Sequence, residues 1–341
     1  MELKRHISRL PNHILKPFGL KLVTSPKPSH DGQESAPIAP NYSKSKLPDG
    51  AADYLQPDNP KLKELQAAYA NPSRHPLKEH MVWSDSLITS DDLRYFRGDN
   101  AYVWQMRGKN MNMLGYALTA YYVKAMDNLY LLRKLEEDDL FGIFTFRIDN
   151  KIISRDLLDS IIEIYFLERH LRISQWPRLN ILDIGAGYGR LAHRFINALP
   201  NVENYFCTDA VAVSTFISDY YLGFRNVHHK AKTIPIYNIE SALKNHTVDI
   251  AINVHSFSEC TLPAVEWWLS LLESKRVKYL MIVPNTMDHD GKLLLTIQRK
   301  DFSKVIERHG YKLIAKEPKY SDECVQEYGI KPTYHYLYEL T

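Results

Sequence analysis

The chain has 341 residues, 45% of them hydrophobic and 24% charged, which is typical of a globular protein with one large or two modest domains. Its formal net charge of +3 is too small to indicate a nucleic-acid-binding protein. Three widely spaced cysteines, Cys207, Cys260 and Cys324, form neither a metal-ligand pattern nor a disulfide framework. No apolar stretch is long enough for a membrane span, and the N-terminus lacks an apolar leader. The sequence therefore predicts a cytoplasmic protein without a nucleic-acid partner.

Residues 1–58 are predicted to be a basic, proline-rich tail and tether. Residues 1–80 hold eleven of the eighteen prolines, with twelve Lys/Arg against eight Asp/Glu. Residues 24–58 are rich in Pro, Ser and Asn, which is typical of a flexible tether. The apolar, lysine-dotted stretch 14–23 is open to two interpretations, a foot on an anionic membrane surface or partner, and a loosely packed tail. Pro17 and Gly19, which interrupt a helix, favour the tail.

Residues 59–175 are predicted to form a mostly helical cap that shapes an acceptor pocket. Helical spacing begins at residue 60, and one long helix is predicted over 111–135. A hairpin over 141–152 has Asp149 and Asn150 at its turn. A helix over 154–172 begins with Ser154 as a plausible cap.

Residues 176–341 alternate strands and helices. After a first strand near residue 181, strands are predicted at 204–208, 226–230, 248–254, 277–283, 311–316 and 333–340, and helices at 191–198, 211–222, 263–274 and 300–309. Helices between successive strands predict an α/β fold, a doubly wound and mostly parallel sheet with right-handed crossovers. The last two strands, with no clear helix between them, predict an antiparallel hairpin at one sheet edge.

The chain is organised around a glycine turn between a short apolar strand and an amphipathic helix. The run is D-x-G-x-G-x-G, with Asp183 at the strand end and glycines at positions 185, 187 and 189. Such a turn lets the backbone approach a ligand, because a Cβ would block both the left-handed turn and the approach. A dinucleotide fingerprint would need a third glycine at position 190, which is Arg190. The run resembles the first motif of class I S-adenosylmethionine-dependent methyltransferases.

This resemblance implies an S-adenosylmethionine site. Asp209 lies twenty residues after Gly189 at a strand end, where a carboxylate can accept hydrogen bonds from both ribose hydroxyls. The alternative is a surface acid that caps the following helix. An acid that would contact adenine after the third strand is not found in the stretch 231–237, AKTIPIY. The predicted cofactor-binding residues are Asp183, Gly185, Ala186, Gly187, Gly189, Asp209 and Asn253.

The stretch NVHSFSEC, residues 253–260, directly follows the fourth strand and would face the transferred methyl group in this fold. A sugar hydroxyl has a pKa far above neutrality, so its methylation benefits from a positioned base. His255 suits that role because an unperturbed imidazole titrates near neutrality, and Glu259 could orient the acceptor or be the base itself. The alternative for His255 is a core histidine satisfied by a carbonyl.

Three stretches together resemble the sugar O-methyltransferase family of bacterial surface-glycan clusters. They are INVHSFSE at 252–259, the glycine motif, and RGDNAYVWQ at 97–105. The resemblance implies O-methylation of a sugar hydroxyl on a nucleotide sugar or glycan. Aromatic faces stack on sugars and amides bind hydroxyls, so the candidate acceptor contacts are Asp99, Asn100, Tyr102, Trp104, Gln105, Ser256 and Ser258. The alternative for 97–105 is a structural joint between cap and core.

The loop NTMDHD at 285–290 offers Asp288, His289 and Asp290 as candidate ligands for a magnesium ion, which some sugar O-methyltransferases use. A solvated turn ending at Gly291 is the favoured interpretation, so no metal is predicted. Three other functions stay open. They are O-methylation of a lipid or natural product, dinucleotide-dependent oxidation, and a non-catalytic cofactor-binding subunit. The sequence does not predict the oligomeric state.

Overall fold

The computed structural model describes residues 46–71, 76–77, 90–98, 113–286 and 289–341. The chain divides into two units, Met1–Ile38 and Ala39–Thr341, and all described residues belong to the second. None of the described helices is long and apolar enough to cross a membrane. The tail over residues 1–45, the acceptor candidates from Asp99 to Gln105, and Asp288 lie outside the described residues.

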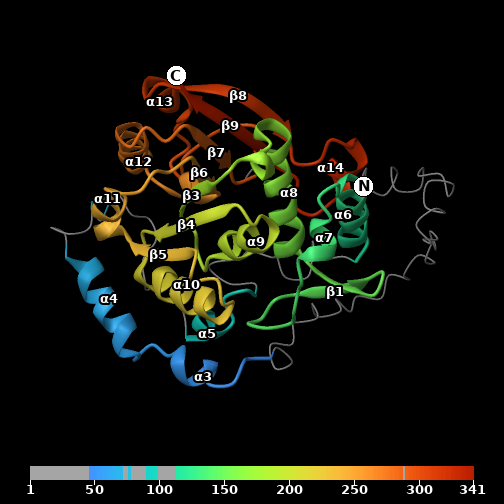
Figure 1. The fold of residues 1–341 in the computed structure, drawn as a ribbon, viewed down its shortest axis with the longest axis horizontal. Helices are drawn as coiled ribbons and strands as arrows, with labels where there is room; N and C mark the ends of the chain where they lie inside the picture. The colour runs from blue at the N-terminus through green and yellow to red at the C-terminus, as the bar shows by residue number, and fades with distance from the viewer. Residues whose placement is uncertain (1–45, 72–75, 78–89, 99–112, 287–288) are drawn as a thin grey trace, which may run out of the picture. The chain divides into compact units, whose positions relative to one another are not determined.

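A seven-stranded sheet forms the centre of the second unit (Figure 1). Its order is β5-β4-β3-β6-β7-β9-β8, in which the first five are parallel and β9 runs antiparallel between β7 and β8. The strands are β3 (Leu179–Ile184), β4 (Val202–Asp209), β5 (Ala231–Pro235), β6 (Ile250–Val254), β7 (Tyr279–Val283), β8 (Tyr311–Pro318) and β9 (Tyr334–Leu340). This confirms the predicted class I methyltransferase Rossmann-like fold, including the antiparallel hairpin at one edge.

Helices cover both faces of the sheet, so the central strands are apolar on both sides. On β3, Ile181 belongs to the core shared with α8 (Arg155–Leu171) and α9 (Arg190–Ala198). Its neighbour Leu182 belongs to the opposite core, which includes α12 (Leu262–Ser274) and α13 (Ser303–Arg308). The same half of the chain also contains α10 (Ala212–Phe224), α11 (Ile239–Ala242) and the short 3-10 helices η5 (Ile173–Gln175), η6 (Ile236–Asn238) and η7 (Ser256–Glu259).

Several short elements precede α8. The predicted hairpin is present as β1 (Thr145–Ile148) and β2 (Lys151–Ser154), and its turn residues Asp149 and Asn150 have positive φ. The Ser154 hydroxyl accepts a hydrogen bond from the Leu157 N–H and caps α8, as predicted. The other elements are α3 (Ala51–Tyr54), α4 (Pro60–Ala70), α5 (Ser90–Arg94), α6 (Met113–Met126) and α7 (Leu131–Lys134).

The structure corrects the predicted boundaries of two elements. The helix predicted over 111–135 is interrupted between α6 and α7, because the Asp127 carboxylate binds the N–H groups of Leu131 and Leu132 and starts a new turn. The strand predicted over 226–230 is wrong. Asn226, at φ 53°, ends the preceding helix in a turn, and β5 begins only at Ala231, opposite Tyr205 on β4.

The ends of the chain differ from the prediction as well. A helix, α14 (Glu323–Tyr328), connects β8 and β9, where no helix was predicted, and Asp322 caps it through the Val325 N–H. The predicted tether extended to residue 58, but α3 is already packed on α10, with the Tyr54 ring stacked on Phe216 at 5.4 Å. Helix α3, within the predicted tether, is therefore packed against α10.

Candidate functional site

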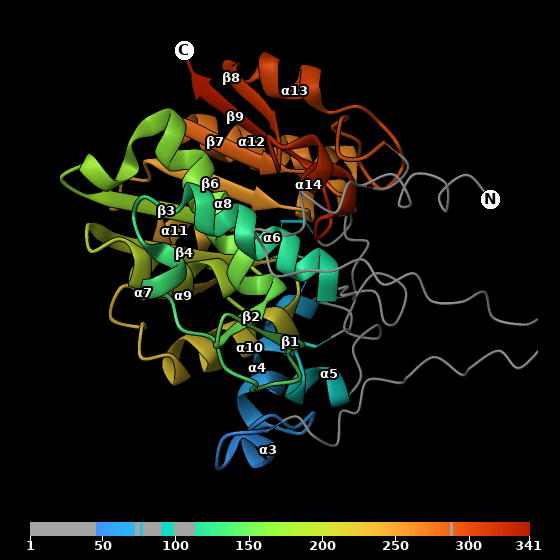
Figure 2. The same cartoon turned by 90° about the vertical axis from the view of Figure 1, so that its right-hand side faces the viewer.

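The glycine loop follows β3 at the carboxyl edge of the sheet, toward which β6 also points in Figure 2. The N–H groups of Gly185 and Ala186 both donate to the Thr208 carbonyl on β4, at 2.9 and 3.1 Å. Gly185 has φ +75°, and a Cβ there would lie 2.3 Å from Ser256. Gly187 has φ +56°, and a Cβ there would meet no atom of the described residues within 4 Å. The loop is thus packed on one side against Ser256 and open above Gly187, as a ligand cradle requires.

Asp209 lies at the end of β4 and supports this loop with its side chain. One carboxylate oxygen accepts the Gly187 N–H at 3.1 Å, and the other accepts the Val211 N–H at 3.0 Å. Burial raises the pKa of Asp209 to about 6, although these hydrogen bonds favour the charged form. Each oxygen of a carboxylate can accept a further hydrogen bond, so Asp209 can bind a polar ligand next to the glycine loop.

Asp183 lies beneath the loop. Its carboxylate is buried and accepts a hydrogen bond from the Tyr205 hydroxyl at 3.0 Å. Burial raises its pKa to about 7, and the hydrogen bond from Tyr205 only partly opposes this. Asp183 therefore anchors β3 to β4 where the loop begins.

Asn253 joins the glycine loop to η7. Its amide nitrogen donates to the Ile184 carbonyl at 2.9 Å, and its amide oxygen accepts the Phe257 N–H at 2.8 Å. The side chain is fully buried. Asn253, predicted to bind cofactor, holds the loop and η7 together through both of these bonds.

His255 begins the turn at the end of β6. Its φ of 70° is unusual for a non-glycine residue, and its N–H donates to the Val283 carbonyl on β7 at 2.7 Å. The imidazole Nδ1 is buried and has no hydrogen-bond partner within the described part of the chain, while the side chain as a whole is partly exposed. Burial, with the nearby cations Arg155 and Lys331, lowers the pKa of His255 to about 3. The ring is therefore neutral at physiological pH, and in the unliganded protein it is a weaker base than an isolated imidazole.

The two residues predicted to be catalytic have different surroundings. The Glu259 carboxylate accepts a hydrogen bond from the Asn285 amide at 3.0 Å, and its charge helps to raise the pKa of Asp209. The Ser258 hydroxyl is buried and accepts the Asn285 N–H at 3.1 Å. These contacts attach η7 to the end of β7. The charge of Glu259 thus affects the pKa of Asp209, whereas the pKa of His255 is affected by the cations Arg155 and Lys331.

The first half of α8 presents a buried row of charged side chains to this edge of the sheet. Arg155 and Lys319 both bind the Asp159 carboxylate, at 2.9 and 2.5 Å. Further along the helix, Glu163 forms a two-pronged pair with Arg190, at 2.9 and 3.1 Å. Arg190, the residue found where a dinucleotide fingerprint has its glycine, therefore fixes α9 to α8.

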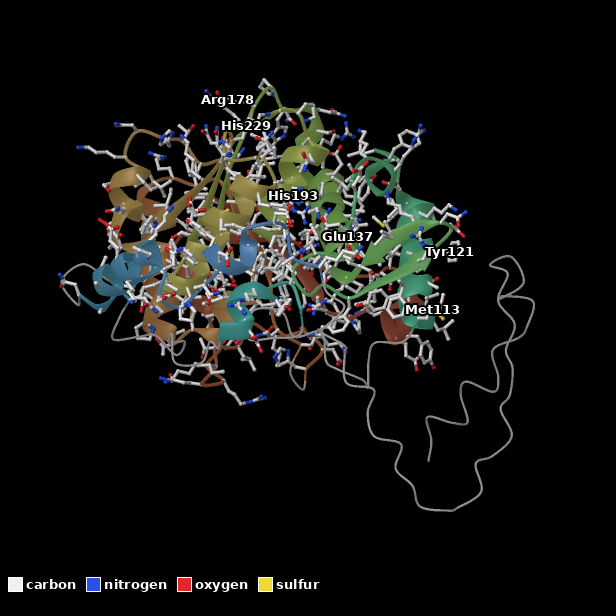
Figure 3. All side chains as sticks on the ribbon, turned by 90° about the horizontal axis from the view of Figure 1, so that it is seen from below. Met113, Tyr121, Glu137, Arg178, His193 and His229 are labelled. Atoms are coloured by element: carbon white, nitrogen blue, oxygen red, sulfur yellow. The ribbon has the colours of Figure 1, made fainter. Side chains whose placement is uncertain are left out.

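A second buried charge network lies around Arg97, which is fully buried. Its guanidinium binds Glu137 and Asp138, each at 2.7 Å, and Asp156 on α8 is 3.6 Å away. Burial alone would raise the pKa of Glu137, but Arg97 and Arg194 outweigh it and lower the pKa to about 2. Figure 3 shows Glu137 among the helices, while the exposed Met113 lies near the rim.

This Arg97 network connects the predicted acceptor motif to the glycine loop. Tyr188, within the loop, hydrogen-bonds Asp156 through its hydroxyl. Arg97 also donates its N–H to the Phe141 carbonyl at 3.0 Å. The chain two residues before Asp99 is therefore anchored to the same helix as the loop.

The loop after β7 shows no metal centre among the described residues, where no group of three or more His, Cys, Asp or Glu side chains is placed to hold an ion. The His289 Nδ1 accepts the Leu293 N–H at 3.4 Å, and Asp290 pairs with Lys292 at 3.5 Å. Asp288 lies outside the described part of the chain.

Sequence reasoning missed Tyr69, Arg97 and the charged row on α8. A signal existed for the last of these. Asp156, Asp159 and Glu163 recur at helical spacing on one face of a helix that is otherwise strongly apolar. Charged groups are buried at such positions only when they are paired. Tyr69 and Arg97 gave no comparable local signal, since their partners are distant in the sequence.

Comparisons with known proteins give only structural likenesses at low TM-scores. The sequence matches no protein-family model and no curated protein. A SAM-dependent methyltransferase from Aquifex aeolicus is similar, with TM-score 0.39 and 14% identity over 54% of this chain and 98% of that one. So is the precorrin-6y C5,15-methyltransferase of Geobacter metallireducens, with TM-score 0.36 and 15% identity over 53% of this chain and 88% of that one.

A candidate tRNA (m1A22) methyltransferase from Streptococcus pneumoniae is also similar, with TM-score 0.37 and 12% identity over 55% of this chain and 70% of that one. At these low TM-scores and identities the likenesses carry no information about substrate.

Proposed function

We propose that the chain is an S-adenosylmethionine-dependent O-methyltransferase. The single observation that carries the proposal is the open glycine loop after β3 with the Asp209 carboxylate bound to its Gly187 N–H at 3.1 Å. Asp209 is proposed to accept ribose hydroxyls beside the loop, where a Cβ on Gly187 would meet no described atom within 4 Å. A dinucleotide-binding turn has its third glycine at position 190, for close packing of the helix on the strand, whereas this chain has Arg190 there, paired with Glu163.

When bound, S-adenosylmethionine would supply a methyl group on a sulfonium sulfur, which an oxygen nucleophile attacks as the carbon–sulfur bond breaks and S-adenosylhomocysteine leaves. The chain's own contribution is alignment, because an in-line transfer gains most of its rate from orientation of the two reactants. Asn253 fixes the distance between the loop and η7 by its bonds to Ile184 and Phe257. The cofactor loop and His255 are thereby held in one rigid unit.

His255 is the proposed base for the acceptor hydroxyl. Its ring is neutral at physiological pH, and it lies at the end of β6, next in the sheet to β3. A proton from the hydroxyl would pass to the imidazole as the oxygen forms its bond to the methyl carbon. Glu259, bound to Asn285, is proposed to orient the acceptor from the other side of η7. No step requires the residues Asp288 to Asp290.

The proposed acceptor is a sugar hydroxyl on a nucleotide sugar or surface glycan. Support comes from the RGDNAYVWQ and INVHSFSE stretches, which resemble sugar O-methyltransferases. Arg97, the first residue of RGDNAYVWQ, is joined through Asp156 to the helix that also holds Tyr188 of the loop. The acceptor residues proposed in that stretch are two to eight positions beyond Arg97, and Ser256 lies against Gly185.

The test is methylation of defined acceptors. Purified protein is incubated with S-adenosylmethionine and a panel of nucleotide sugars, glycan fragments, lipid alcohols and phenols, and products are analysed by mass spectrometry. A base-stable methyl ether on a sugar is the expected product. A methyl ether found only on lipids or phenols would replace the sugar by another hydroxyl. NADH binding with no binding of S-adenosylhomocysteine would contradict the proposal as a whole.

A further inference from the structure

Helix α4, which precedes the proposed cofactor domain in the sequence, lies along α10 (Figure 1). Lys61 near its start binds Asp219 on α10 at 2.5 Å. Tyr69 near its end is buried, and its ring belongs to the core on the α12 side of the sheet. Helix α4 is therefore packed where β4 and β5 end.

The Tyr69 hydroxyl is at the centre of three hydrogen bonds. It donates to the Asp209 carbonyl at 3.2 Å and accepts the Ile236 N–H at 3.1 Å. It is also 2.7 Å from the Thr215 hydroxyl on α10. The Thr215 hydroxyl is also 3.2 Å from the Val211 carbonyl, so the two hydroxyl protons are shared among three acceptors. Tyr69 and Thr215 thus form one hydrogen-bond network with the ends of β4 and β5.

These partners lie at the two places where an adenosine would be held. The Asp209 backbone carries the carboxylate proposed to bind the ribose, and Ile236 is the first residue after β5. The next residue, Tyr237, packs edge-to-face against the Tyr69 ring, with centroids 5.4 Å apart. The acid expected after the third strand is absent here, since β5 runs into Pro235, Ile236 and Tyr237. Ile236 and the rings of Tyr69 and Tyr237 lie at this position instead.

We propose that Tyr69 is a positioning residue for the adenosine half of the cofactor, so that helix α4 is part of the cofactor site. Its hydroxyl fixes the separation between the ends of β4 and β5, and thus between the ribose-binding carboxylate and the wall formed by Ile236 and Tyr237. This inference rests on the proposed function, because it specifies how the same site recognises its cofactor.

The matched pair of variants is Tyr69→Phe and Tyr311→Phe. Tyr311 is also buried, and its hydroxyl donates to the Val277 carbonyl at 2.7 Å, near the starts of β8 and β7. Both variants lose a buried phenolic hydroxyl, but only the first loses it beside the proposed site. Affinities for S-adenosylhomocysteine and methylthioadenosine are measured by calorimetry on the full-length chain, with melting temperatures as the control for folding.

Tyr69→Phe should weaken the binding of both ligands by about tenfold or more, because both contain the adenosine half. Methylthioadenosine lacks the amino-acid half, so an equal loss for both ligands would locate the effect at the adenosine. KM for S-adenosylmethionine should rise with kcat within about twofold, and Tyr311→Phe should bind like wild type. Thr215→Val, a second variant, should weaken both ligands in the same direction. Wild-type affinity in both Tyr69→Phe and Thr215→Val would overturn the inference while leaving the proposed function intact. Absence of binding to the wild-type protein would overturn the proposed function itself.

Discussion

Asp209 allows a quantitative test of the cofactor site, because protonation of its carboxyl would remove the acceptor proposed for the ribose. Burial raises its pKa from 3.8 to about 6 in the unliganded protein. At pH 5 about one carboxyl in eleven stays ionised, so affinity for S-adenosylhomocysteine should be about tenfold weaker there than at pH 7. The affinity should be constant above pH 7.

The stability of the unliganded protein should change with pH in the direction opposite to the ligand affinity. A raised folded-state pKa means that the unliganded protein holds this proton more tightly than the unfolded chain does. Asp209 therefore contributes stability below its ordinary pKa, and this contribution is lost as the pH rises through about 6. Ligand binding favours the ionised carboxylate, so the rise in Tm caused by S-adenosylhomocysteine should grow over the same pH range.

The assay is calorimetric titration from pH 5 to pH 8 with wild type, Asp209→Asn and Asp183→Asn. Asp209→Asn should bind about 10- to 100-fold more weakly at pH 7.5, the equivalent of losing a charged hydrogen bond of about 1.5–3 kcal/mol, and its affinity should not change with pH. Asp183→Asn, the control, removes a different buried carboxyl. Its affinity for S-adenosylhomocysteine should still fall as the pH drops through about 6. Equal pH profiles for wild type and Asp209→Asn would refute the ribose assignment.

Three further perturbations test other parts of the structure. Arg97→Met removes both 2.7 Å ion pairs of a buried guanidinium and leaves the Glu137 charge less compensated. Urea unfolding should show that the free energy of unfolding falls by about 3–5 kcal/mol. A fall of less than about 1 kcal/mol would contradict a stabilising role for these ion pairs. Gly185→Ala places a Cβ 2.3 Å from Ser256 at φ +75°, and should weaken S-adenosylhomocysteine binding. Adding Ser256→Gly should restore part of the lost affinity. No restoration would argue against a clash between the new Cβ and the Ser256 side chain. His255→Gln should reduce methyl transfer by about 10²–10⁴-fold with ligand affinity within about twofold of wild type, whereas full turnover would exclude His255 as the base.

The sheet and the glycine loop could be predicted because their signals are local. Apolar runs ending in glycines, at short fixed spacing, predict a strand, a turn and a helix wherever they occur. The position of Asp209 followed from the same logic, since the second strand must end beside the first. The third strand was misplaced because β5 is short and contains Lys232 and Thr233, which weaken its apolar pattern.

Contacts between distant segments could not be predicted in this way. Tyr69 binds groups 140 to 167 residues further along the chain, and Arg97 binds carboxylates 40 and 41 residues away. No periodicity within either segment specifies such partners. The pKa of His255 was also out of reach, because burial and the cations of α8 and residue 331 lower it from the near-neutral value expected for an isolated imidazole.

The most direct test of the central claim follows the methyl group itself. Methyl-labelled S-adenosylmethionine is incubated with wild type or His255→Gln and with separated nucleotide-sugar, glycan, lipid, protein and nucleic-acid fractions, with and without a metal chelator. The account predicts label in a nucleotide-sugar or glycan fraction, dependent on His255 and insensitive to the chelator. Label confined to protein or nucleic acid, or transfer unchanged in His255→Gln, would contradict it.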